Sequence, residues 1–221
     1  MALTRYTGTV TAVQVPAQLG GKDVVEIRAG AFSYVPVVGI KLPDTVVTIC
    51  DSAFFYNMTL LEVFFGKGVR VVEENAFNGC AALRRVELNE GLESLEYMSF
   101  ALTSALTHIS IPDSVKVMDD GVFAIGGLRE ITIPGSVERI GKQAFTECDA
   151  LETVVILEGV KSIAYDAFSA CDELSSITVP GSVAEIQQDA FSDCAKLTLY
   201  VCAGSAAEAH AKENGIAYKV K

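Results

Sequence analysis

Apolar residues recur along the chain at an almost constant spacing, and the clearest marker is a phenylalanine that follows a small or apolar residue. Successive markers lie 22, 23, 23, 23, 22, 23 and 23 residues apart. Self-similarity of this kind indicates a stack of repeated units and not one globular core. The eight markers are Phe32, Phe54, Phe77, Phe100, Phe123, Phe145, Phe168 and Phe191.

The other apolar positions of each unit fall in the same register, and the unit that ends at Phe145 shows them most fully. Ile131 and Ile133 are two residues apart, so both side chains point to one side of a strand. Pro134 ends the strand because proline has no N–H to donate. A single unit cannot bury its apolar face alone, so neighbouring units are expected to stack into a continuous core. The remaining apolar positions of this unit are Leu128, Val137, Ile140 and Ala144.

The pattern predicts a repeat solenoid, mainly β, of about eight right-handed coils with terminal caps. Each coil is expected to have one parallel strand, with short turns or helical turns on the other side. Neighbouring strands would lie about 4.8 Å apart, which gives a sheet on the order of 35–40 Å long. Both 22-residue intervals lose a residue just before the next apolar position, at Val37 and Leu128, which indicates a loop there because loops tolerate deletions.

Residues Leu128–Cys148 read Leu-x-x-Ile-x-Ile-Pro-x-Ser-Val-x-x-Ile-Gly-x-x-Ala-Phe-x-x-Cys. This motif resembles the leucine-rich repeat, in the 23-residue class found in bacterial surface antigens, and the resemblance covers nearly the whole chain. Ser136 stands where the commonest leucine-rich repeat has Asn, so the deep asparagine ladder and regular convex helix of other classes are not expected. The resemblance implies a binding or adhesion role, often in large extracellular proteins, and it carries over no catalytic residue.

The two ends depart from the repeat, as expected because an outermost coil has no neighbour to cover it. Residues 1–36 are predicted to form an atypical first coil and cap, with an inserted turn at 17–23 that carries a small hairpin. Residues 37–196 would form seven leucine-rich-repeat coils, and residues 197–221 a C-terminal cap. All three parts are expected to belong to one continuous domain.

The C-terminal cap is predicted to contain a strand, a short helix and a final strand. Ser205 and Glu208 have the spacing of a capping box that opens the helix at 206–214. Gly215 then occupies the usual position of a glycine just after a helix, and 216–220 follow as the last strand.

Composition and charge narrow the classes of partner. The chain has 221 residues, half of them apolar, and a formal net charge of −11, which argues against nucleic acid and against anionic membranes. No apolar run approaches the roughly 18 residues needed to cross a bilayer, so no membrane insertion is expected. The first residues lack the features of a secretory signal. The family resemblance implies an extracellular or cell-surface location, and a cytoplasmic one stays open.

Four cysteines lie three residues after a repeat phenylalanine, at Cys80, Cys148, Cys171 and Cys194. A zinc site needs ligands that converge on the ion, and side chains on one parallel ladder point the same way. The same parallel arrangement disfavours an unstrained disulfide. We therefore predict buried free thiols that fill the turns, in particular at Cys148, Cys171 and Cys194.

The two histidines give no indication of catalysis. His108 falls on the outer face of a strand and His210 on the cap helix, and neither has the sequence context of a catalytic triad. Most carboxylates fall in turns or at exposed positions. We therefore expect no enzyme activity, no cofactor and no metal.

The outward-facing side of the predicted sheet is where binding residues are expected. It is apolar on the early coils, carries arginines in the middle and is rich in Ser and Thr at the far end. An exposed aromatic beside arginines is typical of a binding hot spot, whereas the alternative is ordinary filling of a β surface. The candidate ligand-binding residues are Leu61, Phe64, Arg84, Arg85, His108 and Arg129.

These observations predict a monomeric, non-enzymatic recognition or adhesion module that binds a protein or a glycan on the sheet face. Phenylalanine and arginine suit a protein or an acidic glycan better than a small metabolite, for which no deep pocket is implied. The first alternative is a structural spacer of a larger cell-surface protein, without a ligand of its own. The second is an enzyme, which would need convergent titratable groups.

Overall fold

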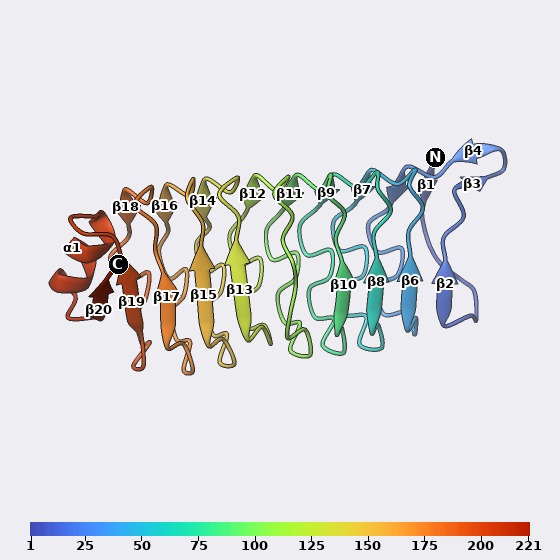
Figure 1. The fold of residues 1–221 in the computed structure, drawn as a ribbon. Helices are drawn as coiled ribbons and strands as arrows, with labels where there is room; N and C mark the ends of the chain where they lie inside the picture. Colours follow the sequence, from blue (N-terminus) through green and yellow to red (C-terminus); the bar gives the residue numbers. More distant parts are fainter.

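The computed structural model describes residues 1–221 and shows a parallel β-solenoid of about ten turns (Figure 1). The turns stack side by side from the N-terminal hairpin to the C-terminal helix. One cluster of 57 buried residues runs through the stack as its core. The repeat solenoid predicted from the phenylalanine spacing is confirmed.

One side of the solenoid carries two parallel sheets, and we call the outward-facing surface of their strands the sheet face (Figure 1). Each strand places equivalent residues of neighbouring coils opposite one another, as Glu62, Arg85 and the residues around them show. The first sheet contains β2 (Ala12–Gln14), β6 (Gly39–Lys41), β8 (Glu62–Phe64) and β10 (Arg85–Glu87). The second contains β13 (Glu130–Ile133), β15 (Thr153–Ile156), β17 (Ser176–Thr178), β19 (Thr198–Val201) and β20 (Ala217–Val220).

A further parallel sheet of nine two-residue strands lies along another side, so the prediction of one strand per coil was wrong. The strands between the two ends of this sheet each hold a buried apolar residue such as Val72, Leu95 or Ile140, whereas the two terminal strands hold half-buried ones. Two residues are too few to show the alternation that identifies a strand. The strands are β1 (Ala2–Leu3), β5 (Glu26–Ile27), β7 (Thr48–Ile49), β9 (Val71–Val72), β11 (Ser94–Leu95), β12 (Val117–Met118), β14 (Arg139–Ile140), β16 (Ser162–Ile163) and β18 (Glu185–Ile186).

The eight repeat phenylalanines form a continuous stack of rings inside the core. Neighbouring ring centroids lie between 4.7 and 5.8 Å apart. Tyr6 covers the first ring at a centroid distance of 5.4 Å, and His210 covers the last, Phe191, edge-on at 5.6 Å. His210 therefore has a structural position at the end of the stack.

Both ends of the solenoid carry elements that the inner coils lack. At the N-terminal end, β3 (Gln18–Leu19) and β4 (Lys22–Asp23) form an antiparallel hairpin. At the other end, α1 (Ala206–Glu213) begins at Ser205, whose hydroxyl accepts a hydrogen bond from the Glu208 N–H, and β20 follows. No helix of the fold is long and apolar enough to cross a membrane.

The turns around each phenylalanine require left-handed backbone. The residue two places after the phenylalanine has a positive φ in all eight units, and in seven of them it is not glycine. A residue with a Cβ is strained there, because a left-handed φ costs about 1–2 kcal/mol. Glu147, with a φ of 54°, is one of the exposed examples.

Replacing Glu147 by Asn is expected to raise the free energy of unfolding by about 0.5–1 kcal/mol, because Asn tolerates left-handed backbone better than Glu. Urea denaturation measures the change. The matched control is Glu138→Asn, since Glu138 is also exposed but has no positive φ. An equal change at the two positions would contradict the explanation by backbone strain.

Candidate ligand-binding face

The sequence-predicted candidates lie on four successive coils of the sheet face. Leu61 is 38% exposed, and Arg84 and Arg85 are exposed on the next coil. His108 and Arg129 are exposed on the two coils after that. Period-two alternation places Phe64 and Arg85 outward, because Val63 and Val86 beside them point into the core. Leu61, Arg84 and Arg129 each lie one residue before their strand and are exposed there. Their role in binding stays a prediction.

Phe64 and Arg85 form a contact that joins β8 and β10. The Arg85 Cζ lies 5.1 Å from the centroid of the Phe64 ring, within the range of a cation–π interaction. Arg85 also forms an ion pair with Glu87, which lies opposite Phe64 in the sheet register. The half-buried Phe64 ring and the Arg85 guanidinium thus form one amphipathic surface element beside Leu61.

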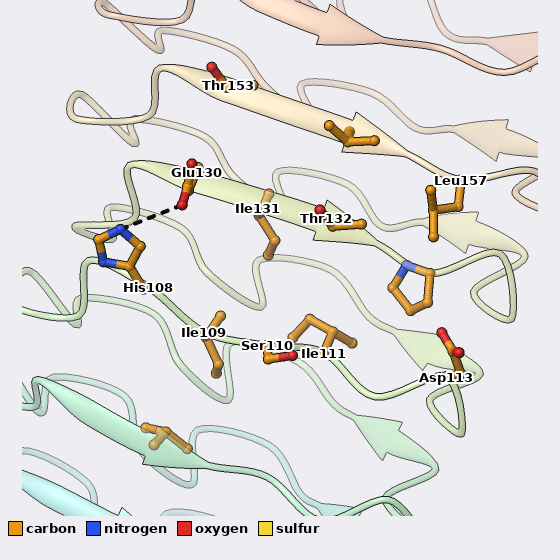
Figure 2. Close-up of a pocket in the computed structure, with 13 residues that line it drawn as sticks. His108, Ile109, Ser110, Ile111, Asp113, Glu130, Ile131, Thr132, Thr153 and Leu157 are labelled. Atoms are coloured by element: carbon orange, nitrogen blue, oxygen red, sulfur yellow. Dashed lines mark ion pairs between the residues drawn. The ribbon is translucent and has the colours of Figure 1, made fainter.

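The other two charged candidates each have a carboxylate neighbour. The His108 Nε2 lies 3.7 Å from the Glu130 carboxylate (Figure 2). The Nδ1 of the same ring lies 2.9 Å from the Thr107 hydroxyl. Arg129 forms an ion pair with Glu152 at 3.3 Å. Exposed pairs of this kind are worth less than about 1 kcal/mol, so a partner's charged group can replace either member at low cost.

The sheet face is interrupted in its middle, which the sequence did not predict. Residues 107–112 run between β10 and β13 but form no strand with either (Figure 1). The Arg129 N–H donates to the Thr107 carbonyl, but the backbone N–H and C=O groups of 108–111 bond to no other backbone group. The connection that leads from this coil to β13 contains Gly126 and Gly127 and is one residue shorter than in most other units.

This interruption opens a groove with a volume of about 540 Å³. Its floor includes Val86, Ile109 and Ile131, which occupy the inward-facing position of three successive coils (Figure 2). Val86 is 9% exposed and Ile131 4%, whereas the equivalent residues of fully paired coils are completely buried. The polar side chains on its rim are His108, Ser110, Asp113, Glu130, Thr132 and Thr153.

A second exposed cluster lies on the turns of the early coils, away from the predicted residues. Tyr34 is 71% exposed, and its ring centroid lies 6.2 Å from those of Phe55 and Tyr56. The sequence contained an indication of this cluster, since aromatic residues occur within two places after the repeat phenylalanine only in these units.

The titratable groups do not converge on a common point. Burial, then repulsion by Glu73 and Asp119, raises the pKa of Glu96, but these carboxylates form one row on successive coils. Burial lowers the pKa of His210, which covers the phenylalanine stack. The structure contains no group of three or more His, Cys, Asp or Glu side chains placed to hold a metal ion.

The cysteines that follow the repeat phenylalanines are free thiols, and each donates a hydrogen bond to a backbone carbonyl of the preceding coil. The Cys148 Sγ donates to the Phe123 carbonyl of the preceding coil at 3.1 Å, and Cys171 and Cys194 make the equivalent bonds. Cys148 and Cys171 are buried as predicted, whereas Cys194 is half-buried near the cap. Burial raises the pKa of Cys148 to about 12, so this thiol is not a nucleophile at neutral pH.

Native protein treated with iodoacetamide at pH 8 should therefore remain unmodified at Cys80 and Cys148, whose thiols both have a pKa of about 12 because of burial. Half-buried Cys202 should react first. Mass spectrometry of native and urea-unfolded samples measures the difference, and all six cysteines should react once the chain is unfolded. Equal native reaction rates at Cys148 and Cys202 would contradict a buried ladder.

Comparison with known proteins gives one family and several structures. The family described as BspA type leucine rich repeat region matches residues 25–151 and 124–208. A leucine-rich repeat protein of T. pallidum has 27% identity and a TM-score of 0.72, with 99% of this chain and 89% of that chain covered. A leucine-rich repeat protein from Bacteroides ovatus has 22% identity and a TM-score of 0.62, with coverage of 90% and 65%. No curated protein matches the chain significantly.

Proposed function

Because the chain belongs to the BspA-type leucine-rich-repeat family, we propose that it is a non-enzymatic recognition module that binds a protein partner on its sheet face. The observation that supports this most is the Phe64–Arg85 contact next to exposed Leu61. Aromatic rings and arginines are enriched at the centres of protein interfaces, where they bury area and pair with carboxylates. The family resemblance to surface antigens supports a place at the bacterial cell surface.

A protein partner fits this face better than a small molecule, since the groove in its middle is open and no deep enclosed cavity accompanies it. Specificity on a repeat surface has to come from the positions that deviate from the repeat. Leu61, Phe64, Arg84 and Arg85 are such positions, because the coil near the C-terminal cap carries only Ser and Thr there, at Ser175, Ser176 and Thr178. A glycan partner and a ligand-free spacer are the alternatives that the experiment separates.

The test is a quantitative pull-down from extracts of cells or host tissue, followed by measurement of the affinity for each captured protein. Truncation of Phe64 and of Arg85 to Ala should each weaken binding by about 1–2 kcal/mol, or more if they are hot spots. The double variant should therefore lose on the order of 30-fold or more in affinity.

The chain provides a matched control at the far end of the same face. Tyr200 occupies the same register position as Thr178, two coils after Val155, and Lys219 lies over its ring at 5.5 Å. Tyr200→Ala/Lys219→Ala removes an aromatic–cation pair of the same type and should leave affinity unchanged. A partner that binds Phe64→Ala/Arg85→Ala as tightly as the parent places the site elsewhere. Binding only on a glycan array supports the glycan alternative, and no variant-sensitive ligand supports the spacer.

A further inference from the structure

The backbone of residues 108–111 has a run of free hydrogen-bonding groups in the middle of an otherwise paired surface. Most buried and half-buried backbone groups in proteins are paired, and a row of unpaired groups beside a sheet is a template for another chain. Ile109 is half-buried and Ile111 is buried, so these groups are not on a fully solvated loop. The coil therefore holds donors and acceptors that a ligand can satisfy.

We propose that the groove at residues 107–112 is a peptide-binding subsite that takes an extended segment of the protein partner, an inference that rests on the proposed function. The segment pairs its backbone with the free groups of 108–111. It places an apolar side chain on the floor formed by Val86, Ile109 and Ile131. This is the arrangement in which main-chain bonds give affinity and alternate side chains give specificity.

An extended peptide matches the groove in spacing and in chemistry. The free N–H and C=O groups follow one another along a chain that rises about 3.3 Å per residue, which another extended chain reproduces. The floor residues are apolar, so burial of one aliphatic side chain against them is favourable. A sugar chain supplies hydroxyl groups but neither this backbone spacing nor an apolar side chain for the floor.

Charge indicates which peptides fit. The groove is lined by Asp113 and Glu130 and has no lining Lys or Arg. The nearby Arg85 and Arg129 are not among the residues that line the groove. A segment with a lysine or arginine next to its apolar residue therefore complements the rim, and a segment with Glu there is repelled.

The experiment uses the intact chain and synthetic eight-residue peptides with blocked ends. One series alternates apolar residues with Lys, a second replaces Lys by Glu, and a third repeats the Lys series with alternate backbone nitrogens methylated. The first should bind, and the second and third should bind at least tenfold more weakly. The methylated series keeps every side chain and removes only the backbone donors, so it isolates the main-chain pairing.

Three protein variants test where the peptide binds. Ser110→Trp fills the groove from an exposed, outward-facing position, and Lys41→Trp places the same ring at the equivalent position of a fully paired coil. Ser110→Trp should lower the affinity for the Lys peptide at least tenfold, and Lys41→Trp should leave that affinity unchanged. Asp113→Asn/Glu130→Gln removes only the negative charges and should also lower the affinity for the Lys peptide. Circular dichroism checks that each variant is folded.

Hydrogen exchange gives the direct readout. The amides of 108–111 should exchange quickly in the free protein and become protected when the Lys peptide binds. No binding by any Lys peptide, equal binding to Ser110→Trp, or equal binding of the methylated series would overturn the proposal. The proposed function fails separately, since it depends on Phe64 and Arg85 and on the captured partner, which Ser110→Trp could still bind.

Discussion

Phe145→Ala is expected to lower the free energy of unfolding by about 3–5 kcal/mol, the range for deletion of a fully buried aromatic ring. Phe145 has no exposed surface, and its ring centroid lies 5.5 Å from that of Phe123 and 5.1 Å from that of Phe168. The cavity would lie in the middle of the stack, where both neighbouring rings lose their contact. Its effect should be larger than that of the same change at Phe191 near the cap, which is 5% exposed.

Urea denaturation of the parent and the variant measures this change. Tyr165→Ala is the matched control, because Tyr165 is an aromatic residue of the following coil that is 46% exposed. Its truncation should cost less than about 1 kcal/mol, as at most surface positions. A change below about 1 kcal/mol for Phe145→Ala would show that the ring stack does not hold neighbouring coils together.

Gly135→Ala should be the second most destabilising change: it is expected to lower the free energy of unfolding by about 3 kcal/mol or to prevent complete folding. A Cβ at Gly135 would lie 1.8 Å from the carbonyl oxygen of Glu158 on the next coil. The obstacle is backbone, so no side-chain rotation relieves it and the two coils must separate. Gly159, with a φ of 123°, faces Gly135 in the same contact. The close approach of the two backbones therefore requires glycine on both coils.

The control for this prediction has the same local sequence. Gly181 stands in Pro-Gly-Ser-Val as Gly135 does, but its Cβ would meet nothing closer than 3.7 Å because the next coil leads into the cap. Gly181→Ala should therefore change stability by no more than about 0.5 kcal/mol. Thermal and urea unfolding of the two variants compare them directly. Similar losses at both glycines would contradict the stacking described for Gly135.

These two glycines show where sequence reasoning about the fold ends. Phe145 and Ile131 could be assigned to the core because their period repeats in every unit, and burial follows from period. The two-residue strands could not, since Ile140 alone looks like any apolar residue that turns inward. The different surroundings of Gly135 and Gly181 depend on how the next coil is placed, which no local pattern records.

The candidate site also has one part that the sequence predicted and another that only the structure shows. Alternation along a strand was enough to place Arg85 and His108 on the outer face. Leu61 is two residues from buried Val63, and it is exposed because it lies just before β8. The contact between Phe64 and Arg85 depends on the register of two coils, and the groove depends on the absence of pairing over 107–112. The residues of that coil have the same apolar pattern as its neighbours, so pattern alone predicted another strand there.

The most direct test of the account is a hydrogen-exchange footprint of the protein with a captured partner bound. The account predicts new protection on the sheet face over 60–65, 83–88, 106–113 and 128–133, with little change elsewhere. Protection confined to the aromatic turns at Tyr34 and Tyr56, or to the cap helix α1, would contradict it. It would show that the solenoid recognises its partner through another surface.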